Sequence, residues 1–249
     1  METISPINAS AITVGQLVAD DIRAAEVFKR LGIDFCCNGK RTLADACARA
    51  EVSVDTVLEN LSQLPTGNRL GSERFDEWEL GFLADYILNV HHAYLYQNLP
   101  FIEELVWKVA AKHGDYNPTL LMVRQVFDEL KADLLAHLQK EEMALFPFIR
   151  QLISANTTET VPFGGQAVSL KAPIDCMEHE HSYAGSLLAQ LREFTNDYTP
   201  PTDACNSHRL MLAKMEELEG DLMRHIHLEN NILFPKALAL EVKNSEVGG

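Results

Sequence analysis

The 249-residue chain lacks several features that would assign it to other classes of protein. It has no uninterrupted apolar run near the roughly 18 residues that a membrane-spanning helix requires. Its opening residues, METISPINAS, show no basic stretch followed by an apolar one, so we expect no secretory signal. Five cysteines are an odd number without the spacing of a disulfide framework, and they favour a reducing cytoplasm.

Positive charge is also scarce. The chain has 21 Lys and Arg residues against 36 Asp and Glu residues, which leaves a formal net charge of −15. So acidic a chain argues against nucleic acid or an anionic membrane as a partner. A hydrophobic content of 47% is nevertheless enough for a sizeable core, in one large or two small domains.

A motif of the form H-x3-E-x3-L-F-P occurs twice, at 137–147 and at 225–235. A histidine and a glutamate four residues apart lie on one face of a helix, roughly 6 Å apart along its axis. One further histidine precedes each copy by a similar distance, namely His92 and His181. We therefore predict a duplicated helical hairpin, each half offering one histidine on its first helix and a His/Glu pair on its second.

These six polar residues fall on the apolar stripes of four predicted helices, where the surrounding positions step by three and four. One interpretation is a set of hydrogen-bonded core histidines with paired carboxylates. However, burying two carboxylates without a cation costs several kcal/mol each. The matched spacing therefore favours a site for two metal ions, with the ligands His92, His137, Glu141, His181, His225 and Glu229.

Imidazole and carboxylate donors together suit iron, manganese or zinc. A structural zinc would require one closed tetrahedron. Four histidines and two glutamates able to bridge instead suit two ions with open positions for a small molecule, and we expect iron first and manganese second. The remaining histidines lie off the ligand faces or too far along the helix, and we expect ordinary polar roles for His91, His113, His179, His208 and His227.

Loop-forming stretches that contain Pro, Gly and polar residues predict an N-terminal domain at 1–65 and a larger domain at 73–243. In the first, helices are expected at 14–31, ending at Gly32, and at 43–50 and 54–64, with Thr42 and Ser53 as N-caps. A linker is expected at 65–72 and a polar crossover at 156–171. Four long helices are predicted near 75–112, 118–154, 173–197 and 204–241, with Pro147 and Pro235 loosening the second and fourth. We expect no strand.

Adjacent cysteines, Cys36 and Cys37, stand in the turn after the first of these helices. They could act as metal ligands or redox groups, and the nearby Lys40 and Arg41 would favour the thiolate. They could equally be two small buried hydrophobic residues. The chemistry of the pair alone does not decide between these interpretations.

Four strings of the sequence resemble the iron–sulfur cluster repair di-iron proteins of the YtfE/ScdA type: DFCCNGKRTL, HLQKEEMALFP, MEHEHSYAG and HIHLENNILFP. The resemblance spans residues 12 to 240, approximately. It implies an all-α fold, in which a small helical ScdA-type domain precedes a hemerythrin-like four-helix bundle. It also implies two non-haem iron ions with oxo or hydroxo bridges, Glu141 and Glu229 as bridging carboxylates, and a cytoplasmic location.

The same resemblance implies repair of iron–sulfur clusters after nitrosative or oxidative stress, with Cys36 and Cys37 as functional thiols. We expect Glu180, the neighbour of His181, to support the ligands. Two alternatives remain open: a hemerythrin-like carrier or sensor of O2 or NO, and an NO-reducing enzyme. The thiol pair favours repair, because a gas carrier needs none. Damaged iron–sulfur proteins would then be the partners and NO or O2 the small ligands, while the sequence leaves a homodimer open.

Overall fold

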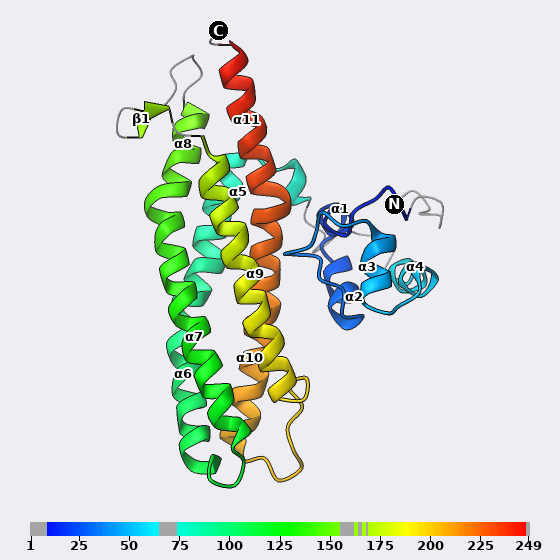
Figure 1. Cartoon of the computed structure of the whole chain (residues 1–249), viewed down its shortest axis with the longest axis vertical. Coiled ribbons are helices and arrows are strands. Elements are labelled where there is room, and N and C mark those ends of the chain that lie inside the picture. Colours follow the sequence, from blue (N-terminus) through cyan, green and yellow to red (C-terminus); the bar gives the residue numbers. More distant parts are fainter. Residues whose placement is uncertain (1–8, 65–73, 155–161, 164–165, 168, 248–249) are drawn as a thin grey trace. The chain divides into compact units, whose positions relative to one another are not determined.

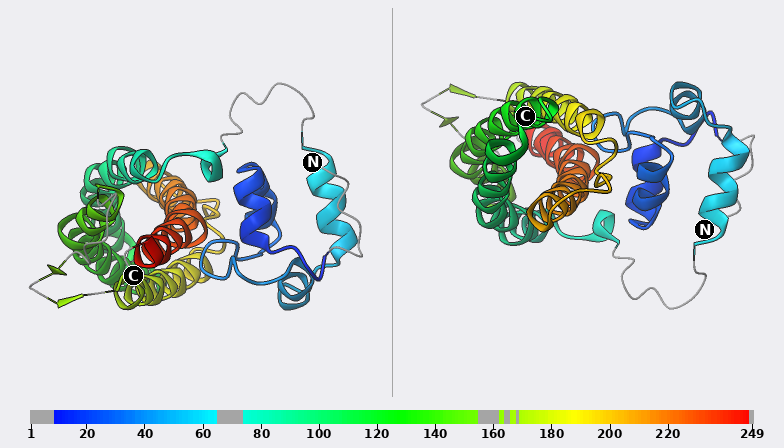
Figure 2. Two further views of the ribbon diagram at one scale, coloured as in Figure 1. Left: turned by 90° about the horizontal axis from the view of Figure 1, so that it is seen from above. Right: turned by 90° about the horizontal axis from the view of Figure 1, so that it is seen from below.

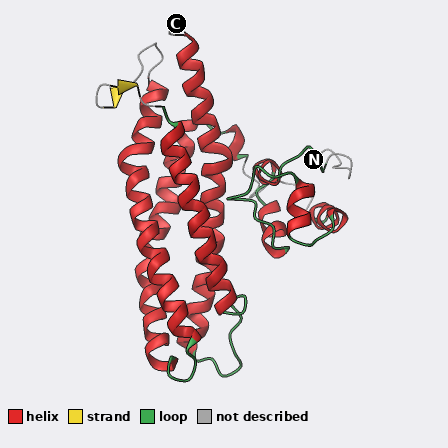
Figure 3. Cartoon of the chain, in the orientation of Figure 1, coloured by secondary structure: helices red, strands yellow, loops and turns green. Residues whose placement is uncertain are grey.

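The protein is described by a computed structural model that covers residues 9–64, 74–154, 162–163, 166–167 and 169–247. Nearly all of its regular structure is helical (Figure 3). The chain divides into two compact units, Met1–Leu83 with Arg224–Ala239 and Ala84–Met223 with Leu240–Gly249. The linker expected at 65–72 falls outside the described residues, and so does most of the expected crossover at 156–171.

The N-terminal part of the first unit consists of four short helices: α1 (Val14–Asp20), α2 (Ala24–Arg30), α3 (Leu43–Arg49) and α4 (Val54–Ser62). Thr42 and Ser53 cap the last two, because each hydroxyl accepts a hydrogen bond from the backbone N–H three residues later. Both predicted caps are confirmed. The helices enclose a small apolar core that includes Leu17, Phe28, Phe35, Leu43 and Val57.

The single helix predicted at 14–31 is wrong, because the chain breaks it at Asp21 into α1 and α2. The Asp21 backbone is extended, and its carboxylate accepts hydrogen bonds from the Arg23 backbone N–H at 3.0 Å and from Arg23 Nε at 2.8 Å. A short acidic side chain that bonds nearby backbone in this way competes with the helical pattern. Helix α2 does end just before Gly32, whose φ of +69° suits glycine.

Four long helical runs follow, and within the second unit they lie side by side around a common axis (Figures 1 and 2). The first comprises α5 (Leu80–Tyr86), η3 (Ile87–His92) and α6 (Ala93–His113), and a 3-10 turn, η2 (Phe75–Glu77), precedes it. The second comprises α7 (Thr119–Lys140), η4 (Glu141–Leu145) and α8 (Phe146–Ser154). The third is α9 (Lys171–Phe194), and the fourth comprises α10 (Asn206–Leu228), η5 (Glu229–Leu233) and α11 (Phe234–Val247).

The predicted all-α bundle is confirmed, with helix α7 packed against both α6 and α9. The apolar stripes read from the sequence form its core, including Leu95, Leu99, Phe127, Leu130, Leu188 and Leu222. Each large apolar side chain buried in this way contributes about 1.5–3 kcal/mol. The expectation of no strand is wrong, because β1 (Pro162–Phe163) and β2 (Gln166–Ala167) form a minimal antiparallel pair.

Three of the four runs contain a π-helical segment, in which hydrogen bonds span five residues instead of four. In η4 the Phe146 N–H bonds the Glu141 carbonyl, and in η5 the Phe234 N–H bonds the Glu229 carbonyl. The next residue in each case is a proline, Pro147 or Pro235, which has no N–H with which to continue the α pattern. The prolines thus loosen the helices without ending them, and π segments of this kind are frequent at functional sites.

Candidate metal centre

The six predicted ligands are all buried, although four are histidines and two are glutamates. Their exposed fractions lie between 0% for the two glutamates and 3% for His137. His92 ends η3, while Glu141 begins η4 and Glu229 begins η5. The π segments therefore occur where the chain presents ligands, and they rotate the following turns relative to a regular helix.

Within the second unit, one carboxylate oxygen lies between two imidazoles. Glu141 Oε2 is 3.4 Å from His92 Nε2 and 3.3 Å from His137 Nε2, and His137 Nε2 is in turn 3.0 Å from His181 Nε2. Neighbouring ligands of one metal ion, at bonds of about 2.1 Å and right angles, stand about 3 Å apart. The separations therefore suit atoms that share metal ions.

The fourth helical run adds the second motif pair. His225 Nε2 lies 3.0 Å from Glu229 Oε1. Ligand atoms gather in two groups, each with all its members within 4.8 Å of one another. One group contains His92 and His225, the other His137 and His181, and both contain Glu141 and Glu229. Each group therefore offers two imidazoles and two carboxylates, a donor set that could hold a metal cation.

Two outer carboxylates hold the far nitrogens of two of these histidines. Glu142 Oε1 lies 2.9 Å from His92 Nδ1, and Glu180 Oε2 lies 2.9 Å from His137 Nδ1. Burial raises the pKa of Glu180, but hydrogen bonds from Lys140 and His137 outweigh it and hold that pKa below its usual value. Such partners fix the ring orientation of a ligating histidine and increase its basicity. The Phe146 ring stacks on His92 at 5.5 Å and completes one wall.

Sequence reasoning singled out Glu180 but attached it to its neighbour in sequence, His181, whereas the contact is to His137. It missed Glu142 entirely. The available signal was the second glutamate of the string H-x3-E-E, which follows Glu141 directly.

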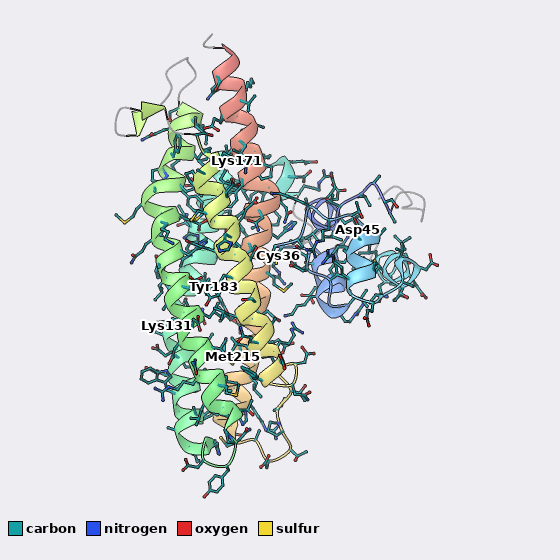
Figure 4. All side chains as sticks on the ribbon, in the orientation of Figure 1. Cys36, Asp45, Lys131, Lys171, Tyr183 and Met215 are labelled. Atoms are coloured by element: carbon teal, nitrogen blue, oxygen red, sulfur yellow. The ribbon has the colours of Figure 1, made fainter. Side chains whose placement is uncertain are left out.

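The two cysteines lie in the loop between α2 and α3, in which Figure 4 labels Cys36. Asp34 organises this loop, because its Oδ1 accepts hydrogen bonds from the backbone N–H groups of Cys36 and Cys37 at 3.1 and 3.0 Å. Cys36 Sγ lies 3.8 Å from Cys37 Sγ. The adjacent thiol, followed by burial and the Asp34 charge, raises the pKa of Cys36 well above its usual value.

Two asparagines that follow Glu229 hold the same loop within the first unit. Asn230 Nδ2 donates to the Cys36 carbonyl at 3.3 Å, and Asn231 Nδ2 donates to the carbonyls of Phe35 and Cys36 at 3.3 and 3.2 Å. The loop backbone passes so close that a Cβ atom added to Gly39 would lie 2.1 Å from Asn231 Oδ1. The C-C-x-G string therefore needs glycine at this position, because a side chain would collide with Asn231.

The histidines expected to lie outside the centre do so, since neither four-residue group contains them. His91 Nδ1 pairs with Asp221 at 3.0 Å, His113 Nε2 contacts Cys205 Sγ at 3.4 Å, and His208 stacks on His113. His179 is exposed. His227 is fully buried against the Phe35 ring, and burial lowers its pKa to about 4.

Comparison with known proteins identifies two matching domain families. Residues 83–237 match the Hemerythrin HHE cation binding domain, and residues 11–65 match ScdA_N, a domain of unknown function. The iron-sulfur cluster repair protein YtfE of Enterobacter sp. (strain 638) is 36% identical over 232 residues, covering 92% of this chain and 97% of the relative. The proteins of the same name from Escherichia coli O81 (strain ED1a) and Escherichia fergusonii are each 36% identical over 228 residues, with the same coverage of 92% and 97%.

The fold and donor set thus define a hemerythrin-like protein with a cation-binding helical bundle. The chain belongs to the family of iron–sulfur cluster repair proteins related to YtfE. Among its described helices, none has both the length and the apolar character needed to cross a bilayer.

Proposed function

We propose that this protein restores iron–sulfur clusters damaged by nitrosative or oxidative stress, and that it does so with two iron ions in the buried centre. The single observation that carries the proposal is the convergence of four imidazoles and two carboxylates in two groups that share Glu141 and Glu229. The names of the relatives, iron-sulfur cluster repair proteins, support the repair role.

In this proposal His92 and His225 hold one ion, His137 and His181 hold the other, and the two glutamates bridge them. Imidazole and carboxylate are the donors that non-haem iron prefers. Iron bound with open positions would supply redox chemistry and a place for NO or O2, with oxo or hydroxo bridging between the ions. Without such cations the buried carboxylates would carry the full cost of desolvation.

The surrounding residues orient the donors and exclude water. Glu142 and Glu180 fix the rings of His92 and His137 through their Nδ1 atoms. Glu180 also pairs with Lys140, so it is itself held in place. Apolar neighbours such as Phe146 shield the centre from solvent.

We assign the partner role to damaged iron–sulfur proteins and the small-ligand role to NO or O2, and we place the protein in the cytoplasm. Five free cysteines support that compartment, since reducing conditions keep thiols reduced. The anchored Cys36–Cys37 loop favours repair over a simple gas carrier, which has no use for two thiols.

Metal analysis tests the centre. Protein grown with ample iron should contain about two Fe per chain, one for each four-residue group. Glu141→Ala and Glu229→Ala should each lose both ions, because each glutamate serves both groups. His113→Ala, outside both groups, is the matched control and should keep them. One zinc per chain would overturn the assignment.

A repair assay tests the role of the thiols. The double variant Cys36→Ala, Cys37→Ala should keep its iron, because no cysteine belongs to either four-residue group. It should fail to restore an NO-damaged iron–sulfur enzyme. If it loses iron, the ligand set is incomplete. If it repairs normally, the pair serves only packing. If the iron-loaded protein reduces NO but restores no cluster, the NO-reducing alternative replaces repair.

A further inference from the structure

A third cluster of potential metal ligands lies in the first unit, outside the dinuclear centre. Asp34, Cys36 and Cys37 bring one carboxylate oxygen and two sulfur atoms within 4.8 Å of one another. Cys36 Sγ is 3.4 Å from Asp34 Oδ1 and 3.8 Å from Cys37 Sγ. None of these residues is needed for the two four-residue groups of the bundle.

The separations match the edges of a tetrahedron around one metal ion. With metal–sulfur bonds of about 2.3 Å and metal–oxygen bonds of about 2.1 Å, two sulfur ligands stand about 3.8 Å apart and a sulfur and an oxygen about 3.6 Å apart. The observed values of 3.8 and 3.4 Å lie within about 0.2 Å of these edges. A disulfide would instead need an S–S separation of about 2.05 Å.

The loop is held in this arrangement by bonds that do not involve the sulfur atoms. Asp34 accepts backbone N–H groups from Cys36 and Cys37, and Asn230 and Asn231 donate to the Cys36 carbonyl. The loop backbone is also tied to the first turn of α1, where the Gly15 N–H donates to the Gly39 carbonyl at 2.9 Å. Ligands that are already held in place lose less conformational entropy when they bind the metal.

The ordinary explanation for these side chains is packing, and it accounts for only one of the two thiols. Cys36 is 5% exposed and fits a small hydrophobic residue, but Cys37 is only half-buried. A half-buried sulfur beside a buried one leaves a side from which an ion and a fourth ligand can approach.

We propose that Asp34, Cys36 and Cys37 bind one divalent transition-metal ion with tetrahedral preference and leave its fourth position open. Two thiolates and one carboxylate suit Zn(II), Co(II) or Fe(II). Each thiol that becomes a ligand releases its proton to solvent, and no electron is transferred. The open position is the feature that separates a transfer site from a closed structural one.

The identity of the natural ion rests on the proposed function, whereas the existence of the site does not. In a protein that donates iron, Fe(II) is the cargo, and a donor keeps it on ligands that a client can displace. The position of the cluster supports this use, because the asparagines that hold it directly follow Glu229 in the chain.

Titration of the iron-loaded, full-length protein with Co(II) under anaerobic conditions tests the site. Sulfur-to-cobalt charge-transfer absorption should saturate at one equivalent, since the bundle centre contains no sulfur and cannot produce it. Cys36→Ser with Cys37→Ser should abolish the band. Asp34→Asn keeps an oxygen that can accept the backbone N–H groups, so it preserves the loop, and it should weaken Co(II) binding at least tenfold.

Matched controls are the other free cysteines. Cys47→Ser, a buried thiol of the same unit, and Cys205→Ser, the thiol that contacts His113, should leave the band unchanged. No charge-transfer band, or a band lost with Cys205 and not with the pair, would overturn the site. A band without restoration of damaged clusters would leave the site standing and refute the repair function. Restoration of damaged clusters without a charge-transfer band would overturn the site and leave the repair function standing.

Discussion

Replacing Gly39 with alanine should loosen the Cys36–Cys37 loop, because the added Cβ would collide with one side chain, that of Asn231. The new Cβ would lie 2.1, 2.6 and 2.7 Å from Oδ1, Cγ and Nδ2 of Asn231. Gly32 is the one described glycine at positive φ, so the backbone at Gly39 accommodates alanine without strain. Asn231 must therefore leave its place and give up its hydrogen bonds to the Phe35 and Cys36 carbonyls.

The size of the effect follows from those bonds. Two lost hydrogen bonds cost about 2 kcal/mol at about 1 kcal/mol each. Asn231→Ala loses the same two bonds and should cost the same amount. The double variant removes the clash along with the bonds, so it should also cost about 2 kcal/mol and not the sum of about 4. The double-mutant cycle thus predicts a coupling close to the full effect of either change.

The rate at which the buried Cys36 thiol is alkylated measures local opening of the loop. Opening made easier by about 2 kcal/mol accelerates alkylation about 30-fold. Gly15→Ala is the control, because its Cβ would meet the Gly39 carbonyl oxygen at 2.8 Å as well as Asn231, so Asn231→Ala should not rescue it. Additive costs for Gly39→Ala and Asn231→Ala, or an unchanged rate in Gly39→Ala, would refute the reasoning.

Three further perturbations have directions fixed by the structure. Glu142→Gln and Glu180→Gln should each weaken iron binding about 10- to 100-fold in a competition with a chelator, because each removes a charged partner of a ligand ring; unchanged affinity would mean that these contacts are incidental. Chelation should lower the melting temperature by about 10 °C, since an ion held at a thousandfold excess over its Kd adds about 4 kcal/mol to the native state; equal melting curves would place the site at the periphery. Burial, together with His113, lowers the pKa of His208, so the unfolded state binds the proton first and stability should fall as pH drops below about 6.5. Asp203 raises and Arg209 lowers the pKa of the same ring. His208→Gln should therefore reduce the dependence of the free energy of unfolding on pH in this range, measured by urea denaturation. An identical slope in the variant would show that His208 is not its cause.

The helices of the bundle could be predicted because their signals are local. Stripes at three- and four-residue spacing placed each long run within six residues of its observed bounds. The break at Asp21 was missed for a different reason. Its apolar neighbours continue the helical pattern, and only the hydrogen bonds of its carboxylate to Arg23 divert the backbone. A side chain that competes in this way for backbone hydrogen bonds barely changes the spacing of the apolar residues.

The ligand residues could be proposed from sequence because the repeat supplied them twice. Their outer partners could not, because Glu142 and Glu180 act on rings that lie 50 and 43 residues away in the chain. Helical spacing places a residue on a face of its own helix, but the partner across the bundle depends on how the helices pack. Glu180 was accordingly assigned to the neighbouring His181 and not to His137.

The two copies of the motif differ at the residue after the motif's glutamate, and this difference decides what each copy touches. In the first copy Glu142 accepts a hydrogen bond from the His92 ring. In the second copy the position is Asn230, whose Nδ2 donates to the Cys36 carbonyl. A carboxylate has no hydrogen to donate and would face that carbonyl with like partial charge, so glutamate cannot replace asparagine there. The exchange of one acceptor for one donor therefore lets one copy of the motif bond the buried ring of His92 and the other copy bond the loop of Cys36 and Cys37.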